Sequence, residues 1–366
     1  MKKIIAMLSV VLFSFGVAKA GELTVTGSAK ASYAIVSSDG TAAAAEAAPK
    51  LGIENEFTLG ASGELDNGYT WKYAIDIDAV ESGATNDDAQ LSVTTPQGTI
   101  GIFLGEGALG VDNAGSQSVI SRPSDTSYGE AMTDTFDIDG YDNVQYHTPA
   151  GLLPYGITAK IGFAPSTNTG ADDYQATGAA RSATAANLGT TAAGGLTVTA
   201  GGNSVTQYQV KANEIPFLDG LSVGADYLEF SGVIGADSQA PSSGAYYATY
   251  AMGPAVIGYS KSFMDMPMNA TNASGAAEMV ENVENRKYSV GINVNDDLSI
   301  SYENEESKAS TSTAATAQYT LESTGIQAAY TMGGMTLGVA MNDHKNAAYT
   351  QNKDVKDTVF SVEMAF

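Results

Sequence analysis

Hydrophobic and polar residues alternate one by one along many short segments of the chain. The segment from 23 to 36 places Leu23, Val25 and Ile35 on one face and hydroxyl or lysine side chains on the other. The segment from 356 to 366 alternates just as strictly and ends on an aromatic residue, Phe366. This period of two predicts half-buried β-strands, and successive segments of this kind exclude an amphipathic helix here.

The alternating segments predict sixteen strands, and the closing strand must pair with one that is already formed. An even number of strands whose last can pair with the first favours an up-and-down closed barrel. The prediction is therefore an all-β, 16-stranded antiparallel transmembrane β-barrel. The predicted strands are 23–36, 51–65, 69–79, 89–95, 99–105, 143–148, 157–164, 204–213, 221–231, 244–252, 255–263, 284–294, 298–306, 316–332, 336–342 and 356–366.

Long and short links alternate between these strands. The long links cover 37–49, 80–88, 106–142, 165–203, 232–243, 264–283, 307–315 and 343–355, and short ones such as 66–68, 96–98 and 253–254 lie between them. The Asn-Gly pair at 67–68 is a typical hairpin signal. Alternation places all long loops at one end, as in outer-membrane barrels, whereas a soluble β-sandwich has no reason to sort its loops in this way.

The first twenty residues predict a secretory signal peptide. A basic start at Lys2 and Lys3 precedes an apolar stretch, and Ala18-Lys19-Ala20 is a typical cleavage site. We therefore expect residues 1–20 to be removed and residues 21–366 to form a single barrel domain. No later apolar run reaches the roughly 18 residues of a spanning helix, but barrel strands cross lipid in about 9–11 residues, with only alternate positions apolar.

The composition is strongly acidic. The chain has 41 acidic and 17 basic side chains, and three of the lysines fall within residues 1–20, which leaves a net charge of −27 for the remainder. Nucleic acid is thereby excluded as a partner, because phosphate binding needs a basic surface. Cysteine is absent, so an exported chain of this kind uses no disulfide.

The whole pattern resembles the Gram-negative general porin family, especially the alphaproteobacterial trimeric porins. The resemblance rests on the signal segment, the opening strand 21–27, the Gly-Thr strand start at 98–99, the long third loop and the terminal Phe366. It implies a homotrimer in the outer membrane, in contact with the lipid bilayer and lipopolysaccharide. It also implies a third loop folded into the lumen and recognition of Phe366 by the outer-membrane assembly machinery. The chain departs from that family in having few arginines.

The third long link, 106–142, concentrates acidic residues against a single Arg122. If this loop folds inward, its carboxylates line the narrowest part of the channel and raise the local concentration of cations. The alternative is an acidic loop on the outer surface, solvated like other charged loops. The acids are Glu106, Asp112, Asp125, Glu130, Asp134, Asp137, Asp139 and Asp142.

Four lysines fall on the polar faces of their strands, namely Lys30, Lys72, Lys160 and Lys287. On the barrel interpretation they point into water, because a lipid-facing lysine near the membrane centre costs about 2–4 kcal/mol. Across from the loop acids they would set a field across the channel. The alternative is that they line the interior without affecting selectivity.

The sequence predicts an outer-membrane porin, a water-filled and cation-favouring channel for passive diffusion of ions and small hydrophilic solutes. No cofactor and no catalytic residue is predicted: only His147 and His344 are present, and no G-x-S-x-G motif occurs. The acids of 134–142 do not follow the calcium-loop spacing, so no metal site is predicted. A substrate-selective channel, an outer-membrane enzyme and an adhesion barrel with a blocked lumen remain alternatives.

Overall fold

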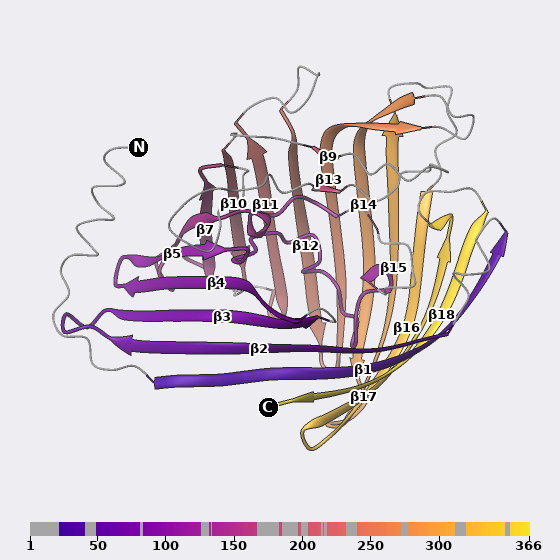
Figure 1. Cartoon of the computed structure of the whole chain (residues 1–366), viewed down its shortest axis with the longest axis horizontal. Coiled ribbons are helices and arrows are strands. Elements are labelled where there is room, and N and C mark those ends of the chain that lie inside the picture. The colour runs from indigo at the N-terminus through magenta and orange to yellow at the C-terminus, as the bar shows by residue number, and fades with distance from the viewer. Residues whose placement is uncertain are drawn as a thin grey trace.

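The structure is a computed structural model in which sixteen strands form one closed antiparallel barrel (Figure 1). This confirms the predicted fold class. The structure describes residues 22–40, 49–80, 83–125, 132, 134–166, 183–184, 197–198, 204–213, 215, 218–231, 240–271, 277–311, 320–347 and 352–366. The predicted signal peptide, 1–20, lies outside the described residues.

Each barrel strand pairs with its neighbours in sequence, and the last pairs with the first. Two further short strands, β8 (Ala183–Thr184) and β9 (Thr197–Val198), form a separate two-stranded sheet. The barrel strands are β1 (Glu22–Gly40), β2 (Lys50–Glu64), β3 (Thr70–Val80), β4 (Gly83–Thr95), β5 (Gly98–Leu104), β6 (Asn143–His147), β7 (Ile157–Ala164), β10 (Val205–Ala212), β11 (Leu221–Phe230), β12 (Ser242–Met252), β13 (Ala255–Thr271), β14 (Ala277–Asn293), β15 (Leu298–Thr311), β16 (Thr320–Met332), β17 (Met335–Lys345) and β18 (Lys353–Ala365).

Closure of the barrel depends on the pairing of β1 with β18. The register places Tyr33 opposite Phe360, and Gly27 exchanges two backbone hydrogen bonds of 2.9 Å with Phe366. The Phe366 ring lies 5.5 Å from the ring of Phe57 on β2. The tail of the chain thus joins its first strand through the backbone and through an aromatic contact on the outer face.

Most outward side chains of the wall are apolar and most inward ones are polar; a group of paired charges on β13–β15, Lys261 with Glu284 and Arg286 with Glu306, is an exception on the described outer face. On β10, Tyr208 and Val210 are exposed outward, whereas Gln207 and Gln209 are buried on the inside. β16 repeats this arrangement, with Ile326 outward and Gln327 inward. An exposed apolar exterior around a polar interior is the arrangement of a barrel that meets lipid outside and water inside.

Several strands extend further toward the long-loop end than the sequence pattern predicts. β13 and β14 continue to Thr271 and from Ala277, through most of the predicted link 264–283. β3 ends at Val80 and β4 begins at Gly83, inside the predicted link 80–88. The backbone ladder continues there because hydrogen bonding between strands does not need alternating hydrophobicity once the strands have left the apolar zone.

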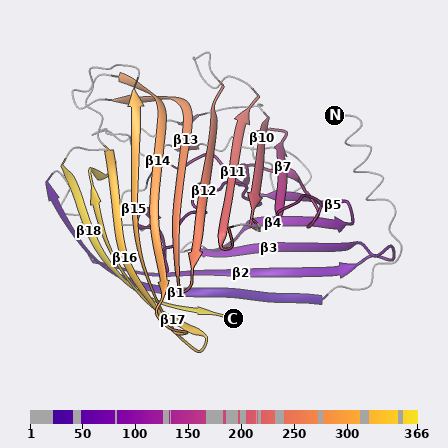
Figure 2. The same cartoon turned by 180° about the vertical axis from the view of Figure 1, so that it is seen from behind.

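Regular helix is limited to two short 3₁₀ turns among the described residues, η2 (Pro123–Asp125) and η3 (Ile138–Gly140). Neither is long or apolar enough to cross a membrane as a helix. Both belong to the link between β5 and β6. Figure 2 shows from behind how β10 to β16 stand side by side as one wall.

Replacing Gly27 by Val should weaken barrel closure. An added Cβ at Gly27 would lie 2.6 Å from the Glu56 carbonyl oxygen and 2.9 Å from the Phe366 ring. Overpacking of this kind costs about 1–3 kcal/mol. We expect a lower urea midpoint in the heat-modifiable gel-mobility assay. Ala29→Val, on the same outer face of β1, is the matched control, and an equal loss in both variants would contradict this role of Gly27.

Candidate functional site

The link between β5 and β6 lies against the inner face of the barrel wall. We call residues 106–142 the inner segment, of which 106–125, 132 and 134–142 are described. At its start, Gln209 on β10 donates from Nε2 to the Leu109 carbonyl at 2.6 Å, and the Val111 N–H donates to Asp226 Oδ1 on β11 at 2.9 Å. Both wall residues belong to the inward, polar faces of their strands.

The same kind of contact continues along the wall. Ser289 on β14 donates to the Gly115 carbonyl at 2.7 Å. On the next two strands, Ser301 accepts from the Val119 N–H and Gln327 accepts from the Ile120 N–H, each at 3.0 Å. The inner segment therefore runs along the inner wall from β10 to β16, held by wall side chains that bind its backbone (Figure 1).

Glycines allow the inner segment to approach the wall at backbone distance. A Cβ on Gly258 of β13 would lie 1.8 Å from the Gly115 carbonyl oxygen, and a Cβ on Gly115 would lie 2.7 Å from the Tyr259 carbonyl oxygen. Any side chain at either position would push the segment away from the wall. This pair of glycines thus fixes the depth at which the segment sits.

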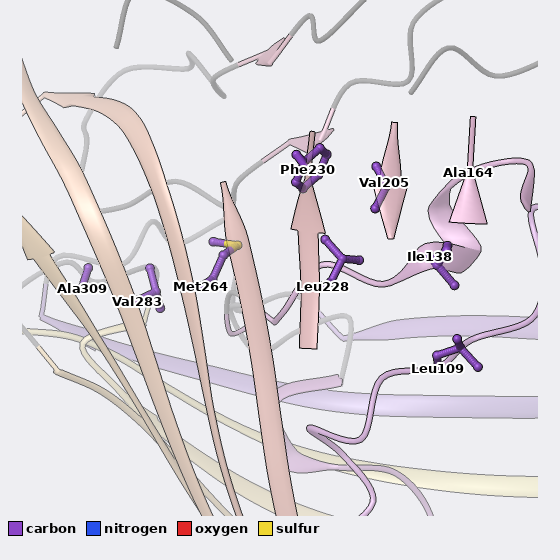
Figure 3. Close-up of a cluster of buried hydrophobic side chains, with 9 residues drawn as sticks. All are labelled: Leu109, Ile138, Ala164, Val205, Leu228, Phe230, Met264, Val283 and Ala309. Carbon is purple, nitrogen blue, oxygen red and sulfur yellow. The ribbon is translucent and has the colours of Figure 1, made fainter. Parts of the chain in front are cut away.

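The inner segment also contributes apolar residues to the buried clusters of the interior. Figure 3 shows Leu109 and Ile138 from the segment with Ala164, Val205 and Leu228 from the wall. Farther along, Val111 packs with Ala245 and Tyr247, Ile120 with the cluster of β1, β17 and β18, and Met132 with Leu321. Polar contacts therefore fix the position of the segment along the strands, and apolar contacts hold it against the wall at several points.

Two cations form ion pairs with the acids in the middle of the inner segment. Lys287 on β14 donates to Asn113 and, at 3.2 Å, to Asp134, and its Nζ lies 3.7 Å from Asp112. Lys287 is only 2% exposed, so the expectation that it faces open water is wrong. It faces inward, as predicted, but the inner segment covers it.

Arg122, within the inner segment, is the second cation. Its guanidinium binds Asp125 and, through Nη2 at 3.0 Å, Asp134, and Nη1 lies 3.4 Å from Glu305 on β15. Glu305 also accepts from the Ser124 N–H at 2.8 Å. Burial opposes the charge of Arg122, but Asp134 and Glu305 outweigh that effect and raise its pKa above the ordinary value.

Asp112 and Asp134 titrate far apart although they share Lys287. Burial raises the pKa of Asp112 to about 6, because the single nearby ammonium only partly offsets the loss of water. Burial also acts to raise the pKa of Asp134, but Lys287 and Arg122 together lower it to about 2. At neutral pH both carboxylates are charged, and Asp112 is the one that takes up a proton on mild acidification.

Asp137 fastens the two ends of the inner segment together. Its carboxylate accepts from the backbone N–H groups of Leu109 at 2.9 Å, Gly110 at 2.6 Å and Ile138 at 2.6 Å. Burial raises the pKa of Asp137, and these backbone donors oppose the shift. Its position is that of a structural clamp on the backbone rather than of a charge open to the barrel interior.

The remaining predicted acids occupy varied positions. Glu106 accepts from the Gly107 N–H at 2.8 Å, and its carbonyl accepts from Asn143 on β6. Asp139 and Asp142 are half-buried near η3. Asp125 is the most exposed of the described acids in the segment, and Glu130 lies outside the described residues.

The other predicted lysines lie on the inner face without being covered by the inner segment. Lys30 lies opposite Glu54 on β2 and Glu363 on β18, and Lys72 on β3 is exposed. Lys160 on β7 is half-exposed and has no cross-strand carboxylate, since His147 and Gln209 are its partners in the two ladders.

Sequence reasoning missed the wall carboxylates as site residues. Glu303 and Glu305 on β15 are fully buried beneath the inner segment, and Glu303 accepts from Ser118 at 2.7 Å. Glu54 and Glu56 on β2 are inward and exposed. The sequence places these glutamates on the polar, alternate positions of their strands. No local signal shows which of these positions contact the inner segment and which face water.

A buried serine, histidine and aspartate also lie together on the inner wall. His344 on β17 is hydrogen-bonded through Nδ1 to Ser323 at 2.8 Å and through Nε2 to Asp357 at 3.0 Å. All three are almost completely buried, so these bonds join β16, β17 and β18 within the wall. Across the described part of the chain, no cluster of three or more His, Cys, Asp or Glu side chains could hold a metal ion.

Comparison with solved structures gives matches along nearly the whole chain. OmpF of Salmonella typhi matches with a TM-score of 0.64 at 13% identity, over 94% of this chain and 98% of that one. The anion-selective porin of Comamonas acidovorans matches at 0.62 and 12% identity, over 94% and 100%. OmpT of Vibrio cholerae, in a trimer form, matches at 0.60 and 11%, over 95% and 100%.

The chain has the porin fold. No family model matches the sequence, and no curated protein does. The likeness to these porins is therefore one of architecture, carried by the sixteen-stranded closed barrel and not by shared residues. Within that porin fold, the inner segment occupies the link between the fifth and sixth barrel strands.

Lys287→Met should destabilise the barrel strongly, because it leaves Asp112 and Asp134 without their shared cation. Removing one partner of a buried charge pair costs about 3–5 kcal/mol. Lys261→Met is the matched control, since Lys261 lies on the outer wall in an exposed pair with Glu284 that is worth at most about 1 kcal/mol. Urea unfolding of the refolded barrels measures the free energy of unfolding of both variants. Equal losses of stability would show that the buried pairs of Lys287 contribute no more than the exposed pair of Lys261.

The Asp112 carboxyl should titrate near pH 6 in a ¹³C NMR titration of the detergent-solubilised protein, with Asp134 ionised down to about pH 2. Because the pKa of Asp112 in the fold exceeds its ordinary 3.8, the ionised form opposes folding above about pH 6 and protonation relieves this as the pH falls. Lys287→Met should move the Asp112 midpoint upward, and Lys261→Met should not. A wild-type midpoint near 4 would contradict the burial of this carboxyl.

Proposed function

We propose that this protein is an outer-membrane porin, a water-filled channel through which ions and small hydrophilic solutes diffuse passively. The observation that carries the proposal is a closed wall of sixteen strands with apolar side chains outward and polar ones inward. Barrels of sixteen strands are wide enough to keep an aqueous channel rather than a side-chain core. The inner segment narrows the passage, and no bond chemistry is involved.

The passage runs along the part of the inner wall that the inner segment leaves uncovered. Among the described residues, the polar contacts of the inner segment with strands beyond its neighbours β5 and β6 go to β10, β11, β12, β14, β15 and β16. Inward side chains on β2 and β3, such as Glu54, Glu56 and Lys72, are exposed to water instead. Exposed charged residues on an inner face support an aqueous path beside them.

We propose that the channel favours cations. Glu54 and Glu56 lie on the uncovered wall, and Asp125 is the most exposed of the described acids in the inner segment. Carboxylates along a narrow passage with low-dielectric walls raise the local cation concentration. The net charge of −27 beyond residue 20 acts in the same direction.

We also propose a homotrimer in the bacterial outer membrane. The outer face of β1 and β2 carries the most exposed apolar side chains of the described wall, Leu23, Leu51 and Ile53. Ile53 lies opposite Ala31 of β1, and Ala29 lies next to Ala31 on the same outer face; these small residues would let a second wall approach closely. A solved structure with the same fold is described as a trimer form.

Planar-bilayer recording of the purified protein tests the channel. We expect conductance steps in multiples of three and, under a KCl gradient, a reversal potential that favours cations. Neutral sugars of increasing size should enter liposomes until a sharp size limit. A protein that folds into the barrel but passes neither ions nor sugars would refute the proposal.

The double variant Glu54→Gln/Glu56→Gln should lower the cation-to-anion permeability ratio. A unit charge about 4 Å from a passing ion in water is worth about 1 kcal/mol, which limits the effect to about fivefold per charge. Glu284→Gln/Glu306→Gln removes two charges from the outer wall and is the matched control. The assignment of the path to β2 fails if both double variants change the reversal potential equally.

A further inference from the structure

Three basic side chains gather on the inner wall directly below the root of the inner segment, in a chain that is otherwise strongly acidic. His147 on β6 lies opposite Lys160 on β7, and Lys160 lies opposite Gln209 on β10. Lys211 follows on the same face of β10, two residues nearer to the short-turn end. All three side chains are half-exposed, so they reach the interior space. We call this group the basic wall.

Among the described residues, no acidic side chain pairs with the basic wall. The two lysines lie diagonally across one strand pair, where Cβ atoms are about 7–8 Å apart. Their like charges repel each other. Neither lysine has an ion pair within the described part of the chain. The described carboxylate on this rung is Asp226, two strands from Lys160 and occupied by the Val111 N–H and by Gln207.

Neutral hydrogen-bonding groups complete this part of the wall. The Lys211 stem and the Tyr247 ring both lie against Gly224 of β11. The Tyr247 hydroxyl lies 3.2 Å from Ser222 Oγ, which donates to Asn213 at 2.6 Å. Hydroxyl and amide groups thus lie near Lys211, where other stretches of the inner wall hold carboxylates.

The side chains next to the basic wall are held by hydrogen bonds to the inner segment and to one another. Gln209 is fixed to the Leu109 carbonyl, and Gln145, beside His147 on β6, is bound to the Gly107 carbonyl and to Asn143 at 2.9 Å. His147 is hydrogen-bonded to Gln145 at 2.8 Å and stacks on Phe103. The basic groups are therefore held on a fixed wall rather than on a mobile loop, which reduces the cost of ordering them around a ligand.

From this arrangement we infer that the basic wall is a binding site for multivalent oxyanions, such as phosphate-bearing or dicarboxylate solutes, on the short-turn side of the inner segment. Two lysines on diagonal positions of one strand pair lie close enough for each ammonium group to bind an oxygen of one such anion through a charge-assisted hydrogen bond. Binding one dianion relieves the repulsion between the lysines, which a monovalent anion does only in part. The site would hold such solutes next to a constriction that we propose to favour cations.

Protection from lysine acetylation tests the site on the wild-type barrel in detergent. Inorganic pyrophosphate is the probe, and mass spectrometry follows the acetylation of each lysine. We expect pyrophosphate to slow the modification of Lys160 and Lys211 at least threefold, while Lys30 on β1 and Lys72 on β3 react as before. Chloride at matched ionic strength is the control for screening. Equal slowing of all four lysines, or none, would overturn the inference.

Titration calorimetry with the same probe gives a second readout. Lys160→Gln/Lys211→Gln should weaken pyrophosphate binding at least tenfold, and Lys30→Gln/Lys72→Gln, with the same change of charge, should leave it nearly unchanged. The reverse order would place the anion at β1 and β3 and refute the site. Neither measurement needs ion flow, so a barrel that failed to conduct would still give a decisive answer about the anion.

Discussion

The interior of this barrel depends on the need of a buried backbone for hydrogen-bond partners. A link that leaves the wall and crosses the inside carries N–H and C=O groups that no ladder satisfies. Here the inward faces of the wall strands supply partners such as Gln209, Asp226 and Gln327. The inward polar side chains therefore do more than face water: they also bind the backbone of the chain's own inner segment.

The charged side chains differ between the part of the wall that the inner segment covers and the part that it leaves uncovered. Where the segment covers the wall, carboxylates and cations neutralise each other, as Lys287 and Arg122 do with Asp112, Asp134 and Glu305. Where the wall is uncovered, charged side chains keep their water. Burying a charge is costly unless it is paired, so the segment can lie only over a part of the wall that brings its own counter-charges. This limits how many of the acids in 106–142 can act on a passing ion.

Alternation of side chains was sufficient to predict the sixteen strands and the direction of each face, since a period of two admits one geometry. It also identified Lys287 as inward. It could not show that Lys287 is covered, because that depends on Asn113 and Asp134, more than 150 residues away along the chain. The clamp formed by Asp137 was equally hidden, because an aspartate that binds backbone N–H groups has the same sequence appearance as one facing water. Strand ends beyond the apolar zone, as in β13 and β14, lost the alternating signal while the ladder continued.

The clamp at Asp137 joins the two ends of the inner segment, so that the residues between them form a closed loop; we call the two joined ends its feet. Leu109 and Ile138, on opposite limbs, meet at one carboxylate and share one apolar cluster. The span between them can then lengthen, shorten or change its residues without moving the feet. The width and charge of the opening inside the cylinder can in this way change while the cylinder itself stays as it is.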